Sequence, residues 1–283
     1  MDAASSSLPT SLDPPPLDRR DKLFFGLDQN AAGLEIGGSY NPLCTAPNVK
    51  HLDYQTTAAL REHYAREGRD VSVVPTVSFV MDGRSYKELT AGETFDWIVA
   101  SHVIEHVSDL VGWLNDCASI LKTGGVLSLA IPDKRFMFDY FRPQTGLARI
   151  IDASGGKKAA RPSLGAVLEH NLSYAMLNGE ICWHPGAQGV PTPGVPMDYI
   201  RQVRQRWLDG EYFDVHVWAF TPNSLRLIIE DLYALGLIRV REVAFFDVSG
   251  CEFFLQLTVD GPGPGMGRQE LAQLARLDEL AIS

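Results

Sequence analysis

The sequence predicts a doubly wound α/β fold with a mostly parallel sheet, a terminal antiparallel hairpin and an inserted lid. Three observations predict it. Short apolar runs alternate with helical patterns from residue 33 to residue 131, a glycine-rich turn follows the first run, and two strand patterns flank Ser249-Gly250 near the C-terminus. Strands and helices that alternate at this spacing are typical of parallel sheets, which bind ligands at the carboxyl ends of their strands.

Composition narrows the class of protein. The chain has 283 residues, 45% of them hydrophobic, which is enough for a sizeable core. A formal net charge of -10 argues against nucleic acid as a partner, because phosphates require a basic surface. No run approaches the length of a membrane span and no signal peptide is present, so we expect a cytoplasmic protein without a membrane partner. The four cysteines form no CxxC pair and are expected to be buried thiols.

The N-terminal half supplies the first five strands. Residues 1–21 are rich in Ser and Pro and are interpreted as a disordered leader. Pro42 and Pro47 leave no room for a helix between the first two strands. In order, we expect strands at 33–37 and 49–54, a helix from Thr56 or Thr57 to 66, a third strand at 71–74 or 77–81, a fourth at 95–100, a helix at 103–121 that ends at the 122–125 glycine cap, and a fifth strand at 126–131.

The alternation breaks between residues 133 and 218, which are interpreted as a lid or substrate-recognition insertion with helical patches near 161–178 and 197–208. Residues 22–132 and 219–260 then form one core. The second part of this core holds a helix that starts at Thr221-Pro222 and the strand pair at 238–248 and 251–259. Residues 261–283 form a tail with a weak amphipathic helix at 268–280.

Two acidic residues occur where the strands end. Glu35 is a lone charge in a buried strand, so we expect its carboxylate to accept hydrogen bonds from the glycine-loop amides or from a ligand ammonium. Asp53 ends the second strand, where it either binds a ligand or caps a turn or helix.

Several segments together resemble the motif series of class I S-adenosylmethionine-dependent methyltransferases. They are Glu35-Ile36-Gly37-Gly38-Ser39, Asp53, Asp82-Gly83, the segment 95–106 and the segment 121–125. The resemblance covers about residues 30–132, and the helix and hairpin at 221–259 are similar to the rest of that fold. It implies a seven-stranded Rossmann-like sheet, S-adenosyl-L-methionine as cofactor and S-adenosyl-L-homocysteine as product.

The resemblance also implies roles for individual residues. Glu35, Gly37, Gly38 and Ser39 would admit the methionine part, Asp53 would accept the ribose hydroxyls, Asp82 with Gly83 would contact the adenine amino group, and Ser101 with His102 would form the floor. Ser39 stands where the family often has glycine. Serine is tolerable at this position if its φ is negative.

Two other activities share parts of these patterns. A nicotinamide-dependent dehydrogenase has the glycine turn and the strand-end acid, but its fingerprint needs a long first crossover helix, which Pro42 and Pro47 exclude. The segment 102–106 spells HxxEH, a pattern of zinc peptidases. We instead expect this segment at the turn after the fourth strand, with Glu105 and His106 in the first turn of a helix, and no metal.

The sequence indicates the residues that bind the methyl acceptor less clearly than those that bind the cofactor. Removal of a hydroxyl proton suits a neutral histidine, and His216 is the first candidate, followed by His170 and then His184. Lys134, Arg135, Tyr140 and Arg142 lie in a segment similar to bacterial methyltransferases of glycan and natural-product pathways, where they would bind an acidic or ring-shaped substrate. The alternative for this segment is an ion-paired surface turn.

We therefore expect an enzyme that methylates a small molecule, with a hydroxyl of a sugar or secondary metabolite as acceptor. A cofactor-binding regulatory or scaffold protein without catalysis is the alternative. The sequence leaves the acceptor atom and the oligomeric state open, with a homodimer as one option.

Overall fold

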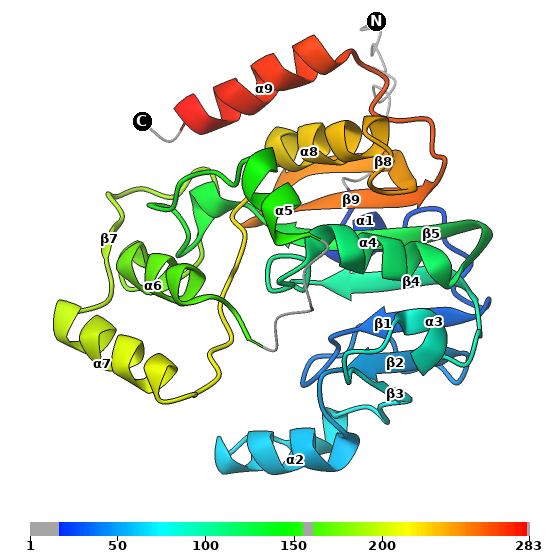
Figure 1. The fold of residues 1–283 in the computed structure, drawn as a ribbon, viewed down its shortest axis with the longest axis horizontal. Coiled ribbons are helices and arrows are strands. Elements are labelled where there is room, and N and C mark those ends of the chain that lie inside the picture. The colour runs from blue at the N-terminus through cyan, green and yellow to red at the C-terminus, as the bar shows by residue number, and fades with distance from the viewer. Residues whose placement is uncertain (1–16, 155–160, 282–283) are drawn as a thin grey trace, which may run out of the picture.

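The computed structural model describes residues 17–154 and 161–281. Its centre is a seven-stranded sheet of order β3-β2-β1-β4-β5-β9-β8 (Figure 1). The strands are β1 Gly33–Ile36, β2 Val49–Asp53, β3 Phe79–Val80, β4 Phe95–Ser101, β5 Leu121–Pro132, β8 Val240–Ser249 and β9 Glu252–Val259. The first five are parallel, and β9 pairs antiparallel with both β5 and β8. The predicted mostly parallel sheet with a terminal hairpin is confirmed.

Helices cover the two faces of the sheet unequally. They are α1 Arg19–Leu23, α2 Thr57–Arg66, α3 Tyr86–Leu89, α4 Leu110–Ser119, α5 Leu147–Ala153, α6 Leu164–Leu172, α7 Met197–Leu208, α8 Pro222–Ala234 and α9 Arg268–Leu280. The larger core joins one face of the sheet to α4 and α8. On the other face, Leu23 and Phe24 at the end of α1 pack on Trp97 and Phe254. This face has so little helical cover because the first crossover, residues 37–48, is a loop, as the two prolines predicted.

The predicted leader is ordered at its C-terminal end. Asp18 caps α1, and Leu23 of that helix is fully buried. The expectation of disorder is therefore wrong for residues 17–21, while residues 1–16 lie outside the described part of the chain. Between β2 and β4, the strand lies within 77–81, whereas Val71–Val73 forms a single 3₁₀ turn.

The predicted helix over residues 103–121 begins too early. Asp109 accepts a hydrogen bond from the Gly112 amide at 2.8 Å and caps α4. The helix therefore starts at Leu110, and residues 102–109 form a turn before it. The expected glycine cap is also wrong, because Gly124 and Gly125 belong to β5. A Cβ at Gly125 would lie 3.1 Å from the Phe95 carbonyl, so glycine here allows two strands to approach closely.

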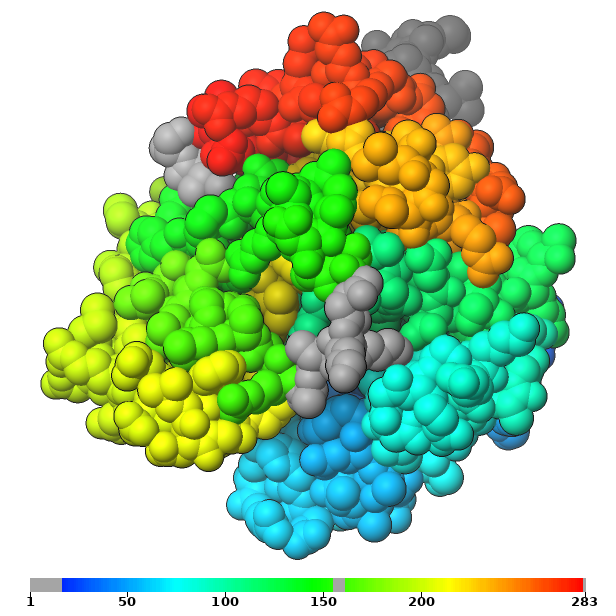
Figure 2. Space-filling model, in the orientation of Figure 1, coloured from blue at the N-terminus to red at the C-terminus, as the bar shows by residue number. Residues whose placement is uncertain are grey.

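The insertion lies at the carboxyl ends of the strands. In Figure 1 it occupies the side toward which the arrows of β1 and β4 point, and in Figure 2 it forms the continuous green-to-yellow part of the surface. It contains α5, α6, α7 and a small hairpin of β6 Ala175–Met176 and β7 Thr192–Pro193. Only α6 and α7 correspond to the predicted helical patches. Part of the expected lid, residues 155–160, is outside the described residues.

One arginine fastens the insertion to the segment that leads back to the sheet. Arg142 has a fully buried side chain and pairs with Asp139 at 3.0 Å and Glu169 at 2.9 Å. It also donates hydrogen bonds to the carbonyls of His216 at 2.9 Å and Val217 at 3.0 Å. Because buried charges are costly unless they are paired, this set of contacts holds residues 139, 169 and 216–217 in one arrangement.

The C-terminal helix was expected in a tail but belongs to the fold. Leu271 and Ala275 of α9 are buried, and Asp278 accepts a hydrogen bond from the Asn223 amide at the start of α8 at 2.9 Å. Asp278 also pairs with Arg135 at 3.2 Å. The helix was predicted with its correct bounds, but its docking surface was not.

The cysteines differ in burial. Cys44 and Cys117 are buried as expected, whereas Cys182 is exposed and Cys251 is half-buried. Among the described residues, no helix is both long and apolar enough to cross a membrane.

The contact between β1 and β4 yields a stability prediction. A Cβ at Gly33 would lie 2.1 Å from the indole ring of buried Trp97, so Gly33→Ala should lower the free energy of unfolding by about 1–3 kcal/mol. Gly165→Ala is the control, because its Cβ meets only Ser163 Oγ at 3.8 Å in α6. Gly165→Ala should raise the free energy of unfolding by up to about 1 kcal/mol, because alanine favours a helix more than glycine does. Urea denaturation measures both, and equal effects would contradict this packing.

Candidate active site

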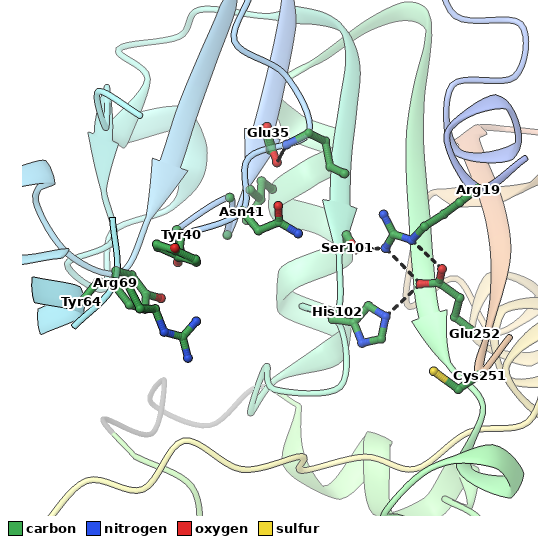
Figure 3. A pocket seen from close by; sticks show the side chains of 15 residues that line it. Arg19, Glu35, Tyr40, Asn41, Tyr64, Arg69, Ser101, His102, Cys251 and Glu252 are labelled. Atoms are coloured by element: carbon green, nitrogen blue, oxygen red, sulfur yellow. Dashed lines mark hydrogen bonds and ion pairs between the residues drawn. The ribbon is translucent and has the colours of Figure 1, made fainter. Parts of the chain in front are cut away.

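A cavity of about 560 Å³ lies at the carboxyl ends of β1 and β4. Ligand sites in proteins have volumes of about 300–1,000 Å³. In Figure 3, Tyr40, Tyr64 and Arg69 face Arg19, His102 and Glu252 across the open space. The predicted residues Glu35, Gly37, Gly38, Ser39, Ser101 and His102 all line this cavity.

Glycine is required at the turn after β1 for steric reasons. Gly37 has φ +73°, and a Cβ there would lie 2.7 Å from the Val103 side chain. At Gly38 a Cβ would lie 3.1 Å from the Glu35 carboxylate. Ser39 has φ +37°, so the negative φ expected for a tolerated serine is not observed. A left-handed non-glycine residue is a strained feature that clusters at functional sites.

Glu35 is held by the loop that replaces the first crossover helix. Its side chain accepts hydrogen bonds from the amides of Leu43 at 2.8 Å and Cys44 at 3.0 Å. These donors follow Pro42, so the expected pairing with the glycine-loop amides is wrong. Burial raises the pKa of Glu35 to about 7, and the two amides oppose this shift only in part.

Asp53 lies behind the cavity wall. One carboxylate oxygen accepts hydrogen bonds from the amide and the hydroxyl of Ser39, both at 3.0 Å, and the other accepts from the Tyr54 amide at 2.7 Å. The helix-cap alternative is wrong, since Thr56 caps α2. Asp53 instead stabilises the left-handed Ser39, and burial raises the pKa of its carboxyl.

The predicted adenine contacts lie elsewhere. Asp82 is exposed, and its two carboxylate oxygens accept hydrogen bonds from Arg84 Nε at 3.0 and 2.9 Å. Gly83 lines a second cavity of about 180 Å³ together with Val107 and Trp113. The structure therefore does not bring Asp82 and Gly83 into the larger cavity.

Two charged residues that the sequence analysis missed complete the cavity floor. Glu252, at the start of β9, pairs with Arg19 Nε at 2.6 Å and with His102 Nε2 at 2.9 Å. Arg19 also donates to the Ser101 hydroxyl at 2.7 Å. No local pattern could have indicated this set, because Arg19 and Glu252 are near opposite ends of the chain. Burial lowers the pKa of His102, but Glu252 and Glu105 outweigh burial, and the net shift is upward.

His216 is buried beside this floor. Its Nδ1 is hydrogen-bonded to Asp139, and its Nε2 lies 3.7 Å from a carboxylate oxygen of Glu105. Burial alone would raise the pKa of Asp139, but His216 and Arg142 outweigh burial and bring this pKa down to about 2. An ionised Asp139 orients the ring and leaves Nε2 for other contacts.

The other two histidine candidates have different surroundings. The ring of His170 lies 5.9 Å from that of His216, and Phe138 contacts both. Burial lowers the pKa of His170 to about 4, so this ring is neutral at pH 7. His184 is exposed, and its Nδ1 accepts a hydrogen bond from the Gly186 amide at 3.1 Å.

The basic residues expected to bind substrate are engaged within the protein. Lys134 is buried and donates to the Tyr140 carbonyl at 3.1 Å, and burial lowers its pKa to about 8. Arg135 pairs with Asp133 and Asp278, which agrees with the ion-paired turn that we had considered as the alternative. Arg142 is the buried clamp described above. The Tyr140 ring packs against Phe141 and Trp183.

The larger cavity fits the amino-acid part of S-adenosylmethionine. Gly37 and Gly38 bring the backbone to the cavity without side chains, and the ion pair of Arg19 and Glu252 places both signs of charge on its floor. A zwitterionic amino acid needs partners of both signs. The residues present are thus compatible with this cofactor.

Comparisons with known proteins point the same way. A family model described as a methyltransferase domain matches residues 15–232. A ubiquinone biosynthesis O-methyltransferase from Parvibaculum lavamentivorans is 55% identical over 40 residues. That match covers 14% of this chain and 16% of the relative, so the chain spans only a small part of that protein.

Solved structures resemble the chain weakly. A Rhodobacter sphaeroides structure described as a zinc-dependent alcohol dehydrogenase has a TM-score of 0.46 at 12% identity, covering 86% of this chain and 90% of the other. The CcbJ methyltransferase from Streptomyces caelestis has a TM-score of 0.39 at 12% identity, covering 90% of this chain and all of the other. At such scores neither likeness carries an assignment of function.

The surroundings of Glu35 predict a pH dependence of stability. Its pKa rises from 4.5 to about 7 on folding, so the folded protein holds more protons in this window and stability falls as pH rises through it. Relative to Glu35→Gln, wild type should therefore lose up to roughly 3 kcal/mol of unfolding free energy between pH 4.5 and pH 7.

Chemical denaturation at a series of pH values measures this difference. Glu62→Gln, on the exposed face of α2, is the control and should follow the wild-type profile. Parallel profiles for wild type and Glu35→Gln would contradict the assignment.

Proposed function

The chain belongs to the methyltransferase domain family, and from that premise we propose that it transfers a methyl group from S-adenosylmethionine to a hydroxyl oxygen of a small molecule. The observation that carries the choice of oxygen is the group formed by buried Glu105 and His216 with half-buried His106, which borders the cavity floor at His102. A hydroxyl must lose its proton during methylation, and imidazole and carboxylate groups are suited to this task.

The bound cofactor supplies an electrophilic methyl group on a sulfonium. Methyl transfer is an in-line displacement, so the main task of the protein is to position the acceptor. Ser101 ends β4 at the cavity floor and His102 follows it. The Glu105 carbonyl accepts hydrogen bonds from the Val217 and Trp218 amides at 2.7 and 3.1 Å. These bonds hold His216 beside the floor.

His216 is our first candidate for the proton-accepting group. Asp139 is ionised at neutral pH and is hydrogen-bonded to Nδ1, which fixes the ring so that Nε2 faces Glu105. His170 is the second candidate, because its Nδ1 is buried without a hydrogen-bond partner in the described structure. The role of either residue depends on where the acceptor binds.

For the cofactor, we assign Glu35, Gly37, Gly38 and Ser39 to the methionine part, Ser101 and His102 to the floor, Asp53 to the ribose, and Asp82 with Gly83 to the adenine. Asp53 would have to exchange its bond to the Ser39 hydroxyl for the ribose hydroxyls. For Asp82 the proposal requires that its carboxylate leave Arg84.

Aromatic residues of the insertion support a ring-shaped acceptor. Phe138 and Tyr174 are stacked with their ring centroids 4.9 Å apart, and Phe138 also contacts His216. Stacked aromatic faces suit a planar ring or the apolar face of a sugar. A substrate role for Arg135 and Arg142 would require them to leave their acidic partners, and Lys134 would have to release the Tyr140 carbonyl. A sugar or secondary-metabolite hydroxyl remains the proposed acceptor.

Two other functions remain for comparison. A dehydrogenase is disfavoured, because residues 37–48 contain no helix on which a dinucleotide pyrophosphate could rest. A cofactor-binding scaffold without catalysis would bind S-adenosylmethionine but would transfer no methyl group to an acceptor. Incubation with methyl-labelled cofactor and a panel of phenols and glycosides distinguishes the scaffold from the enzyme.

The assignment of Asp53 predicts a loss of cofactor affinity. Asp53→Asn removes a charged acceptor and the support for the left-handed Ser39, so S-adenosylhomocysteine should bind about 1–3 kcal/mol more weakly in isothermal titration. Asp198→Asn, on the exposed face of α7, is the control. An unchanged affinity of Asp53→Asn would refute the ribose assignment.

For His216 we expect a loss of turnover without a loss of cofactor. His216→Ala and His216→Gln should lower methyl transfer roughly 10²- to 10⁴-fold, while S-adenosylhomocysteine binding is retained. His184→Ala, at an exposed histidine of the insertion, should keep full turnover. If both His216 variants turn over at the wild-type rate, this residue is only structural.

A further inference from the structure

Glu105 is a buried carboxylate without a hydrogen bond. It follows β4 in the turn at 102–109, its side chain is 1% exposed, and neither carboxylate oxygen has a hydrogen-bond partner in the described structure. Buried charged groups are normally hydrogen-bonded, paired or coordinated to a metal, since burial without compensation is expensive. The surroundings of this carboxylate therefore require an explanation.

Three histidine nitrogens face the same oxygen of Glu105. His102 Nδ1 lies 3.6 Å from it, His216 Nε2 3.7 Å and His106 Nε2 3.9 Å. These separations are too long for hydrogen bonds. Two ligand atoms bound to tetrahedral zinc at about 2.0–2.1 Å lie about 3.3 Å apart, so small shifts of the side chains would suffice to enclose an ion.

The remaining ring nitrogens are bound in the way that metal-ligating histidines usually are. His216 Nδ1 is hydrogen-bonded to Asp139, and His106 Nδ1 to Asp214 at 2.8 Å. A carboxylate on the outer nitrogen holds the ring in position and leaves the lone pair on Nε2. In both residues Nε2 is the nitrogen that faces Glu105.

We propose that Glu105, His106 and His216 bind one divalent transition-metal ion of the zinc type. The three ligand atoms lie within 4.8 Å of one another. Two imidazoles and one carboxylate are typical of Zn²⁺ and Fe²⁺ sites, whereas Mg²⁺ prefers oxygen ligands. From the sequence alone we expected no metal at the HxxEH segment. In the structure this segment is a turn, and the third ligand comes from the insertion.

Three protein ligands leave a coordination position open. The site borders the large cavity through His102, so this position suits a hydroxyl oxygen of the methyl acceptor, an inference that rests on the function proposed above. Ligation would occupy the Nε2 lone pair of His216. The ion would make a bound acceptor hydroxyl more acidic, and its proton would pass to His170, the second candidate base, as the methyl group leaves the sulfonium for the oxygen.

Metal binding is tested on the full chain after treatment with a chelator. Equilibrium dialysis against Zn²⁺ should give one ion per chain, and Co²⁺ in its place should produce visible d–d absorption. Glu105→Gln and His216→Gln should weaken Zn²⁺ binding at least about 100-fold, and Asp214→Asn, at an exposed outer partner, about 10-fold. His184→Gln is the matched control and should bind as wild type. Thermal melting confirms that each variant is folded.

The outcomes separate the site from the methyl transfer. Absence of Zn²⁺ binding in wild type, or equal binding by wild type and Glu105→Gln, overturns the site. Label transfer from S-adenosylmethionine is measured in the same preparations. Transfer without metal binding overturns the metal site and leaves the proposed function standing. Metal binding without transfer to any tested acceptor supports the site and counts against the proposed function.

Discussion

The parallel pairing of β1 with β4 is the constraint on which the rest of this structure depends. Gly33 lies opposite Trp97 and Ile36 opposite Ala100, so the two strands end at the same level. The glycine turn after β1 and the turn that begins at His102 therefore open into one space. This register is possible because Gly33 has no side chain where the Trp97 ring packs. The absence of a helix between β1 and β2 leaves room for the loop whose amides bind Glu35.

The insertion completes the site through buried polar contacts. Arg142 joins Asp139, Glu169 and the backbone near His216, while the Glu105 carbonyl accepts two amides from the same segment. These contacts link the turn after β4 to a part of the chain more than a hundred residues away. The ion pairs of Arg142 with Asp139 and Glu169 therefore help to align the side of the site proposed for the methyl acceptor with the side that binds the cofactor.

Local patterns predicted most of the secondary structure. The bounds of α7 and α9 were correct, and the loop between β1 and β2 followed from two prolines. The predicted start of α4 was wrong. The apolar spacing continues through residues 103–107, but tertiary contacts impose a turn there. The sequence could not show how far the basic residues at 134–142 are paired, since two of their acidic partners, Glu169 and Asp278, lie far along the chain.

The sequence by itself determined the strand-end residues of the site. Glu35, Gly37 and His102 line the cavity because residues at the carboxyl ends of neighbouring parallel strands must meet. Only the tertiary structure decided which groups surround them. The contacts of Glu252 with His102, and of His216 with Asp139 and Glu105, join residues from distant segments. Such contacts leave no periodicity in the sequence, because they depend on how the insertion and the hairpin pack on the sheet.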